Sequence, residues 1–375
     1  MTTGVVCTLD DFAALRSEWN ELVCRMELPE IFYAWEWHWF YHKHFRNGVP
    51  LFIVTVRDGG RLIGLAPMCL TRRKALGRRV RVLETIVGNM ADYRNLLIDG
   101  TQNRWRTVEA IWEALDRHSS EWDVIEMRQV PSQDVTVFQL TKTISQAADM
   151  RHAMRVASRT SRMYYAGDYQ SKMDAKRIHR IRNKRAQLTR EGRLTCTVGE
   201  PDTEEFWLEF LRLHQAQRPD SPLHRPAGRR LFADLRGHFG ARDELECSRV
   251  RIDGRIAAMH FGFRDQRKIY YYMPVIAEEF RQERAGNILT LSMVEHYAPT
   301  HREFDLLRGD ESYKTWWTDD LAVNYRLRIH RNSNVAAWAD GVVPATKEYL
   351  RALAFPGYMA SRVRGVLKRR QDRVE

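Results

Sequence analysis

The residues best suited to chemistry lie in one segment near the end of the chain, Asp305-Leu-Leu-Arg-Gly-Asp-Glu-Ser-Tyr-Lys314. It contains three carboxylates, Asp305, Asp310 and Glu311, followed by Tyr313 and Lys314. Carboxylates can take a proton from a nucleophile, and a phenol or an ammonium can stabilise a leaving group. The segment is therefore a candidate catalytic loop. The alternative is structural, with the tyrosine packed under the tryptophans that follow and the lysine in solvent.

A lone histidine, His260, lies in the apolar segment Ile256–Phe263, which is typical of a strand. An imidazole titrates near neutral pH, so His260 is a candidate general base. The alternative is a hydrogen-bonded histidine of the core. Asp305, Asp310 and Glu311 compete for the same role. Asp305 could instead brace its loop, and Asp310 or Glu311 could orient the imidazole or hold an acceptor ammonium.

A candidate phosphate site is the loop Arg281-Gln-Glu-Arg284-Ala-Gly286-Asn287, which precedes a predicted helix. Backbone N–H groups at a helix start favour anions, Gly286 permits close approach, and Arg281 and Arg284 supply positive charge. A plain helix start beside two arginines is the alternative.

Two further groups of residues are candidates for lining a site. Tyr271 points opposite to Tyr270 and Tyr272 on a predicted strand, so it is expected to face either the donor channel or the core. Asp92 and Arg94 open another predicted strand and are expected to contact the acceptor.

The composition restricts the class of protein. The chain has 375 residues, 44% of them hydrophobic, which excludes global disorder and suits two domains. Its five cysteines never stand in CxxC spacing, so neither a disulfide framework nor a zinc site is indicated, and no metal is expected. The N-terminus does not resemble a signal peptide and no apolar run could span a membrane, so we expect a cytoplasmic protein.

The net charge of +12 is concentrated in two places. Residues 151–195 carry about +10, and within them Lys176, Arg180 and Lys184 form one stripe of an amphipathic helix. A second basic amphipathic helix, with Arg362, Lys368 and Arg369, is predicted near the C-terminus. A solvated face is the ordinary explanation of such stripes. Donor phosphates, an anionic membrane surface or tRNA are the functional ones, and the coupled apolar face favours the membrane over nucleic acid.

The elements that must position these residues occur twice along the chain. The first half predicts a helix whose apolar positions run from Phe12 to Met26, with Asp10 or Asp11 as its cap. A hairpin at 51–70 follows, then strands at 80–87 and 94–99, a helix around 105–115 and a strand at 122–130. The second half predicts helices at 203–217 and 227–239, a hairpin at 245–264, a strand at 268–274, a helix at 286–297 and a strand at 303–307.

The matching order predicts an α/β (α+β) protein built from two diverged copies of one unit, each a mixed, mostly antiparallel sheet flanked by helices. We expect domains at 1–150 and 196–335, a basic linker with its helix at 151–195, and a basic helical tail at 336–375. His260 has only Ala66 opposite it in the first copy, so the chemistry is assigned to the second copy.

Several segments carry a resemblance to a known family: Phe32–Trp37, Leu62–Pro67, Asp92–Leu97, Lys176–Leu188, Tyr270–Tyr272 and, above all, Phe304–Lys314. The chain resembles tandem-domain acyltransferases of the GNAT superfamily, in particular the CelD-like branch and bacterial ceramide-synthase-like N-acyltransferases. More distantly it resembles the Fem-type aminoacyltransferases. The resemblance covers residues 5 to 330 and implies two GNAT-like units in tandem.

The resemblance implies transfer of an acyl group from a thioester donor, acyl-CoA or an acyl-carrier protein, to an amine acceptor. The pyrophosphate-binding pattern of the superfamily is met only in part here, because one of its glycines is missing. With the basic helices, we expect an enzyme peripheral to the inner membrane that acylates a long-chain amino lipid. The alternatives are acetylation of an amino sugar in exopolysaccharide synthesis, aminoacyl-tRNA-dependent transfer, and a binding module without activity.

Overall fold

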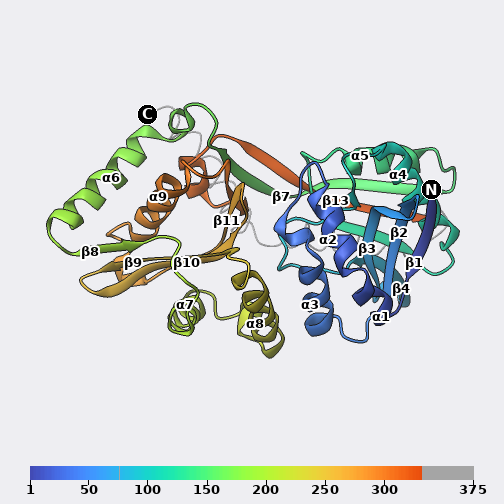
Figure 1. Ribbon diagram of the computed structural model, residues 1–375, viewed down its shortest axis with the longest axis horizontal. Helices are drawn as coiled ribbons and strands as arrows, with labels where there is room; N and C mark the ends of the chain where they lie inside the picture. The colour runs from blue at the N-terminus through green and yellow to red at the C-terminus, as the bar shows by residue number, and fades with distance from the viewer. Residues whose placement is uncertain (76, 332–375) are drawn as a thin grey trace.

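The computed structural model describes residues 1–75 and 77–331. The predicted C-terminal helix, with Arg362, Lys368 and Arg369, lies outside the described residues. Helices cover both faces of a sheet in each half of the chain, and the two halves lie side by side (Figure 1).

The first half begins with a strand and four helices, continues with four strands and ends in a helix, a strand and a helix. Its strands are β1 (Thr2–Val6), β2 (Leu51–Asp58), β3 (Arg61–Ala75), β4 (Arg78–Thr85), β5 (Leu97–Ile98) and β6 (Val124–Pro131). Its helices are α1 (Leu9–Ala14), α2 (Arg16–Cys24), η1 (Ile31–Tyr33), α3 (Trp35–Phe45), α4 (Arg104–Arg117) and α5 (Thr136–Ser145).

The second half repeats this order. Its strands are β8 (Leu194–Thr197), β9 (Leu245–Ile252), β10 (Arg255–Arg264), β11 (Lys268–Ile276) and β12 (Glu303–Arg308). Its helices are α6 (Ala175–Arg190), α7 (Glu204–Gln217), η3 (Pro222–His224), α8 (Pro226–Gly240), η4 (Glu278–Phe280), α9 (Ala285–Tyr297) and η5 (Ser312–Trp316), with η2 (Tyr169–Lys172) before them.

Two long strands, β7 (Met150–Tyr164) and β13 (Leu321–Arg331), join the halves. Among the described residues one sheet runs in the order β1-β2-β3-β4-β6-β13-β7-β12-β11-β10-β9-β8, with β5 paired to β3. β13 lies between β6 and β7, and the end of β7 pairs with β12 of the second half. Figure 1 shows β7 and β13 running from one half into the other.

In each half one pair of strands is parallel and the other neighbours are antiparallel. β4 runs parallel to β6 in the first half, and β11 runs parallel to β12 in the second. The predicted α/β fold with two similar units is therefore confirmed.

The first predicted helix shows how the local pattern is realised. All of its apolar positions from Phe12 to Met26 are buried, but the chain bends at Leu15 and divides them between α1 and α2. The cap is Thr8, whose hydroxyl accepts the N–H of Asp11 at 3.1 Å, and not an aspartate as predicted.

Residues 150–164, which we expected in a basic linker, form the strand β7. The predicted strand at 94–99 is reduced to β5. Residues 94–96 instead form an irregular segment, in which the Arg94 N–H donates to the Gln129 carbonyl at 3.0 Å.

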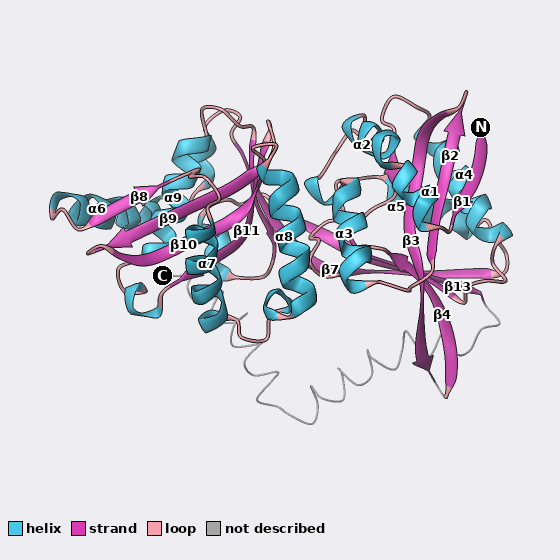
Figure 2. Ribbon diagram, turned by 60° about the horizontal axis from the view of Figure 1, so that its bottom comes forward, coloured by secondary structure: helices cyan, strands magenta, loops and turns pink. Residues whose placement is uncertain are grey.

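The core between the halves is aromatic and shared. Trp37 of α3 packs edge-on against Phe263 of β10, with ring centroids 5.5 Å apart, and Phe32 packs against Tyr272 of β11. Figure 2 shows α3 and α8 beside each other at this junction, where Lys43 Nζ lies 2.9 Å from Asp234. The two halves are therefore packed as one body on this side of the sheet.

A buried cluster of charges also crosses the junction. Glu30 of the first half binds Lys268 Nζ at 2.9 Å and Arg162 of β7 at 3.1 Å. Arg162 also pairs with Asp305 at 3.3 Å and with Glu303 at 3.5 Å. Three carboxylates thus face two cations. Lys268 and Arg162 each pair with Glu30 of the first half and with a carboxylate of β12 in the second half. We refer to these five residues as the junction cluster.

Candidate active site at the junction of the two halves

The candidate site lies where β11 and β12 separate. Their parallel pairing covers only Lys268–Tyr270 against Glu303–Asp305, after which β11 continues to Ile276 without β12. The edge of β11 that follows Tyr270 is therefore open on that side among the described residues. An extended chain bearing amides can pair with such an edge.

A bulge in β11 shapes this opening. Tyr271 and Tyr272 stand opposite the single residue Gly262 of β10. The N–H of Tyr272 donates to His260 Nε2 at 3.0 Å. A Cβ at residue 262 would lie 2.4 Å from the Tyr270 carbonyl oxygen and 2.5 Å from His260 Cε1, so only glycine fits.

His260 is placed as a structural residue and not as a free base. Its Nδ1 is bonded to the buried Glu246, its Nε2 accepts the Tyr272 N–H, and its ring is fully buried. The ring stacks on Tyr271 at a centroid distance of 4.6 Å. Both nitrogens are therefore occupied in this structure, and the role of His260 as general base stays a prediction. Glu246 orients the imidazole, and not Asp310 or Glu311.

Tyr271 faces the core and not an open channel. It is 4% exposed, and its hydroxyl shares a hydrogen bond of 2.9 Å with Thr290 of α9. The neighbouring Tyr272 points to the other face, where its hydroxyl donates to the Met90 carbonyl of the first half at 2.6 Å. Tyr272, which sequence reasoning did not select, therefore connects the bulge to the other half.

The loop that follows β12 is held by Lys314. Its Nζ donates to the Arg308 carbonyl at 2.7 Å and to the Leu307 carbonyl at 3.3 Å, and it pairs with Glu311 at 3.1 Å. The loop turns through positive φ at Leu307 (58°) and Gly309 (142°). Lys314 is 4% exposed, so its ammonium stabilises this conformation from inside.

The other predicted residues of this loop have different environments. Asp310 and Glu311 are exposed, whereas Tyr313 is half-buried and burial raises the pKa of its phenol. Asp305 is fully buried. It accepts the Tyr93 hydroxyl at 2.9 Å and the Leu307 N–H at 2.8 Å, and so braces the loop and belongs to the junction cluster.

The predicted acceptor residues lie against this loop. The Asp92 carboxylate pairs with Arg308 Nε at 2.6 Å, which joins a loop of the first half to the catalytic segment of the second. Burial raises the pKa of the Asp92 carboxyl, and Arg308 opposes that shift. Asn89 contacts both arginines: its side-chain oxygen accepts from Arg94 at 3.3 Å, and its backbone carbonyl accepts from Arg308.

The phosphate loop fits a nucleotide donor poorly. A Cβ at Gly286 would meet the Ile276 side chain at 2.4 Å, so this approach is already filled. Arg281 pairs with Glu278 at 2.6 Å, and the exposed Arg284 begins α9 at φ 58° with no side-chain cap. Asn287 is only partly exposed in the first turn of α9. The three glutamates of residues 278–284 are paired with Arg281, Arg255 and Lys184, so Arg281 is already engaged and only Arg284 of the two loop arginines has no ion pair within the described residues.

The basic stripe of α6 borders the same loop. Lys184 pairs with Glu283 just before α9, whereas Lys176 and Arg180 are exposed and have no ion-pair partner in the described part of the chain. The opposite face of α6 buries Ile178, Ile181 and Leu188 against α9. Lys176 and Arg180 are therefore a free cationic surface on a firmly packed helix.

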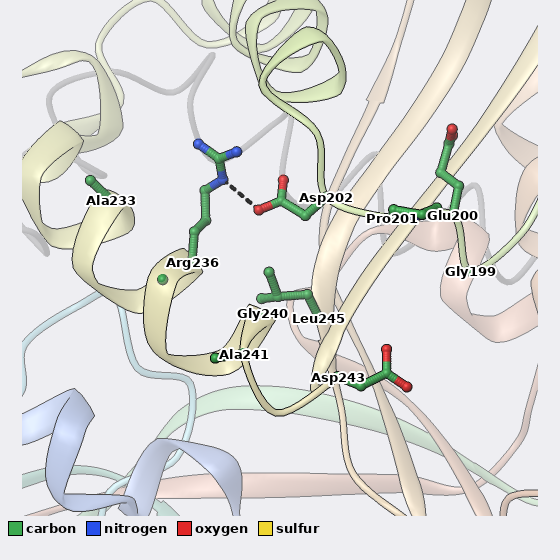
Figure 3. A pocket seen from close by; sticks show the side chains of 11 residues that line it. Gly199, Glu200, Pro201, Asp202, Ala233, Arg236, Gly240, Ala241, Asp243 and Leu245 are labelled. Atoms are coloured by element: carbon green, nitrogen blue, oxygen red, sulfur yellow. Dashed lines mark hydrogen bonds and ion pairs between the residues drawn. The ribbon is translucent and has the colours of Figure 1, made fainter.

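A separate hollow lies away from these residues, between α8 and the segment before α7 (Figure 3). Arg236 Nε bonds to Asp202 at 2.8 Å across it. The other two carboxylates there, Glu200 and Asp243, also pair with arginines. The hollow thus supplies no free base. Within residues 1–75 and 77–331 no cluster of histidine, cysteine or carboxylate side chains is arranged to hold a metal.

Comparison with protein families matches residues 175–315 to the acetyltransferase (GNAT) domain. The match begins with α6 and ends in η5, so it contains the separation of β11 from β12, the bulge and the Lys314 loop. No curated protein sequence matches the chain significantly.

Solved structures match nearly the whole chain. FemX is 12% identical with a TM-score of 0.56, covering 87% of this chain and 97% of its own. The C-terminal domain of a putative lysylphosphatidylglycerol synthetase from Agrobacterium fabrum is 10% identical, with a TM-score of 0.54 and coverage of 89% and 96%. L-PGS from Bacillus licheniformis is 10% identical, with a TM-score of 0.50 and coverage of 88% and 95%.

At these identities the similarity concerns the fold. Residues 175–315 are similar to the acetyltransferase (GNAT) domain, and nearly the whole chain shares its fold with these solved structures.

Proposed function

We propose that this protein is an N-acyltransferase that moves an acyl group from a phosphopantetheine-type thioester, as in acyl-CoA, to the amine of a membrane-associated acceptor. The acceptor that we favour is a long-chain amino lipid such as a sphingoid base. The observation that carries the proposal is the Asp92–Arg308 pair, which joins both halves beside the open edge of β11.

The reaction needs a base for the acceptor ammonium, a binding surface for the donor arm and a group that stabilises the departing thiolate, and this site offers a candidate for each. The acceptor enters as an ammonium and must lose a proton before its nitrogen attacks the thioester carbon. Asp92 can hold that ammonium and take the proton, because burial brings the pKa of its carboxyl closer to working pH. The open edge of β11 can bind the amides of the donor arm, and Lys314 keeps the adjoining loop in place.

The reaction forms the C–N bond and breaks the C–S bond, and the departing thiolate then needs a proton. Tyr313 can stabilise the thiolate by donating a hydrogen bond, because burial raises the pKa of its phenol and keeps it protonated, and the proton that the thiolate finally takes is the one released by the acceptor amine. No step requires the nucleotide part of acyl-CoA, whose phosphates fit residues 278–284 poorly.

The acceptor class is supported by two observations. A synthetase of lysylphosphatidylglycerol, a lipid, shares the fold. Lys176 and Arg180 also present free positive charge that suits an anionic leaflet. No described helix is long and apolar enough to cross a membrane, so we propose peripheral attachment at the cytoplasmic face.

A second candidate function is transfer from aminoacyl-tRNA, which the likeness to FemX and the poor phosphate loop favour. Acetylation of an amino sugar is the third. A single comparison distinguishes them: incubation with palmitoyl-CoA, acetyl-CoA or aminoacyl-tRNA, each with sphinganine or glucosamine, followed by mass spectrometry of the amide. We expect palmitoyl-sphinganine. Formation of only another product, or of none, contradicts the proposal.

The role of Asp92 is tested in the same assay. We expect Asp92→Asn to lower kcat at least 100-fold, because the ammonium loses both its partner and its base. Asp58→Asn, at an exposed hairpin turn, is the matched control and should leave kcat unchanged. Full activity of Asp92→Asn would remove Asp92 from the mechanism.

A further inference from the structure

Arg94 is a buried cation without a counter-ion. Its side chain belongs to a residue only 4% exposed, and no carboxylate of the described residues lies within 4.0 Å of its guanidinium. Its one side-chain hydrogen bond in the described structure runs to the Asn89 side-chain oxygen, and its Nε has no partner. Burial, followed by the charge of Arg308, lowers the pKa of Arg94 to about 10.

The surroundings increase the cost of this charge. Arg308 bonds to the backbone of Asn89 while Arg94 bonds to its side chain, so the two guanidinium groups converge on one residue. Arg128 adds to the positive field at Arg94. The nearest carboxylate, Asp92, is engaged by Arg308 at 2.6 Å.

A fold does not gain stability from such an arrangement. Removing a charge from water costs several kcal/mol, and in proteins a partner normally offsets that cost. Here the matching carboxylate is missing from the described residues, although other buried arginines have one. Arg162 pairs with three carboxylates and Arg328 with Glu126. The charge of Arg94 is therefore suited to a negative group that arrives with a ligand.

The position of Arg94 identifies which ligand that is. It lies two residues after Asp92, on the first-half loop that contacts the catalytic loop of the second half. The donor side is the edge of β11, whereas this loop approaches from the acceptor side. A planar guanidinium suits a phosphate or a carboxylate, which it can bind through two parallel hydrogen bonds.

We infer that Arg94, together with Arg308 and Asn89, binds an anionic group on the acceptor, so that the acceptor is an amine that also carries a phosphate or a carboxylate. This inference rests on the proposed N-acyl transfer and adds the charge of the substrate. Asp92 would contact the ammonium and Arg94 the anion, which fixes the amine between them. A neutral amino lipid would leave Arg94 without a partner.

The experiment compares three long-chain amines in detergent micelles: sphinganine 1-phosphate, 2-aminohexadecanoic acid and sphinganine. Binding is measured by isothermal titration calorimetry without donor, and acylation is measured separately with palmitoyl-CoA. We expect the wild-type protein to bind one anionic amine at least tenfold more tightly than sphinganine. The preferred anion distinguishes phosphate from carboxylate.

Arg94→Gln should remove the preference and leave the affinity for sphinganine unchanged. The matched control is Arg106→Gln, an exposed position on α4. We also expect Arg94→Gln to leave Tm unchanged or raise it, because it removes an uncompensated buried charge. If the role of Arg94 were purely structural, Arg94→Gln would lower Tm.

If Arg94→Gln does not fold, Asn89→Asp serves instead. Asn89 is exposed, and an aspartate there would give Arg94 a partner and exclude the ligand anion. Equal binding of all three amines by the wild-type protein, or a preference that survives in both variants, would overturn the inference. Anion-selective binding without acylation would instead refute the proposed reaction and leave the inference standing.

Discussion

Single residues at the junction show how burial decides what a side chain can do. His260, Glu246 and Tyr272 satisfy one another, so the imidazole is used to hold a backbone N–H. Arg94 is comparably buried but incompletely compensated, because its Nε has no partner among the described residues. At this scale, incomplete compensation marks the groups that are available for a substrate.

Glu303 allows a test of the junction cluster by pH. Burial, reinforced by Asp305, raises the pKa of Glu303 to about 7, whereas a glutamate in the unfolded chain titrates near 4.3. The folded protein thus holds a proton that the unfolded chain has lost, and its stability falls as pH rises from about 4.5 to about 7. Burial of a carboxylate in a cluster with three carboxylates and only two cations explains why the pKa of Glu303 is raised.

Glu303→Gln mimics the protonated form, so it should remove this loss. We expect similar urea unfolding free energies for variant and wild type at pH 5. At pH 8 the variant should be more stable by about 1–3 kcal/mol. A difference that is the same at both pH values would show that Glu303 does not titrate in this range.

At the scale of elements, the bulge in β11 depends on Gly262. Gly262→Ala should destabilise the protein by about 1–3 kcal/mol, because its Cβ meets the Tyr270 carbonyl and the His260 ring. Gly237→Ala in α8 is the matched control, since nothing lies within 4 Å of its Cβ. It should stabilise by about 0.5–1 kcal/mol.

Thermal unfolding followed by circular dichroism measures both variants. Two shifts of Tm in the same direction would contradict this account of the bulge. Acyl transfer by Gly262→Ala should also fall, because the open edge of β11 begins at the bulge.

The elements that sequence reasoning predicted were those with a local pattern. The hairpins and amphipathic helices follow from turn residues and apolar spacing within each segment. β7 was missed because residues 151–159 are mostly exposed on both faces and mostly polar, which leaves no alternation to detect. β13 does have a local pattern, because Val323, Tyr325, Leu327 and Ile329 alternate with polar residues, but sequence reasoning overlooked it.

For the candidate site, the sequence indicated several of the residues but not the contacts between them. Residue types selected Asp92, Arg94 and Lys314, but the Asp92–Arg308 contact joins positions more than 200 residues apart. Arg308 stood inside the catalytic segment without an assigned role. For His260, the signal that was overlooked is Glu246, an acidic residue in an otherwise apolar part of the neighbouring strand.

For the whole molecule, the sheet order implies cooperative unfolding. Leu327 of β13 is fully buried in the first-half core, and β13 pairs along its length with β7, which continues into the second half. We expect Leu327→Ala to cost about 2–5 kcal/mol and to shift one calorimetric transition as a unit.

Leu208→Ala, at an exposed position of α7, should change stability by less than about 0.5 kcal/mol. Separation of the calorimetric trace of Leu327→Ala into two transitions would show that the halves unfold independently.

The insertion of β13 between β6 and β7 also has a consequence during synthesis. The ribosome completes β6 at Pro131 but does not reach Leu321 until about 190 residues later. At about 5–20 residues per second, that delay is on the order of 10–40 s. For that time the nascent first half lacks the strand that pairs with β6 and exposes the edge of β6 to other chains in the cell. The last strand of the described residues is thus the one that completes the sheet next to β6.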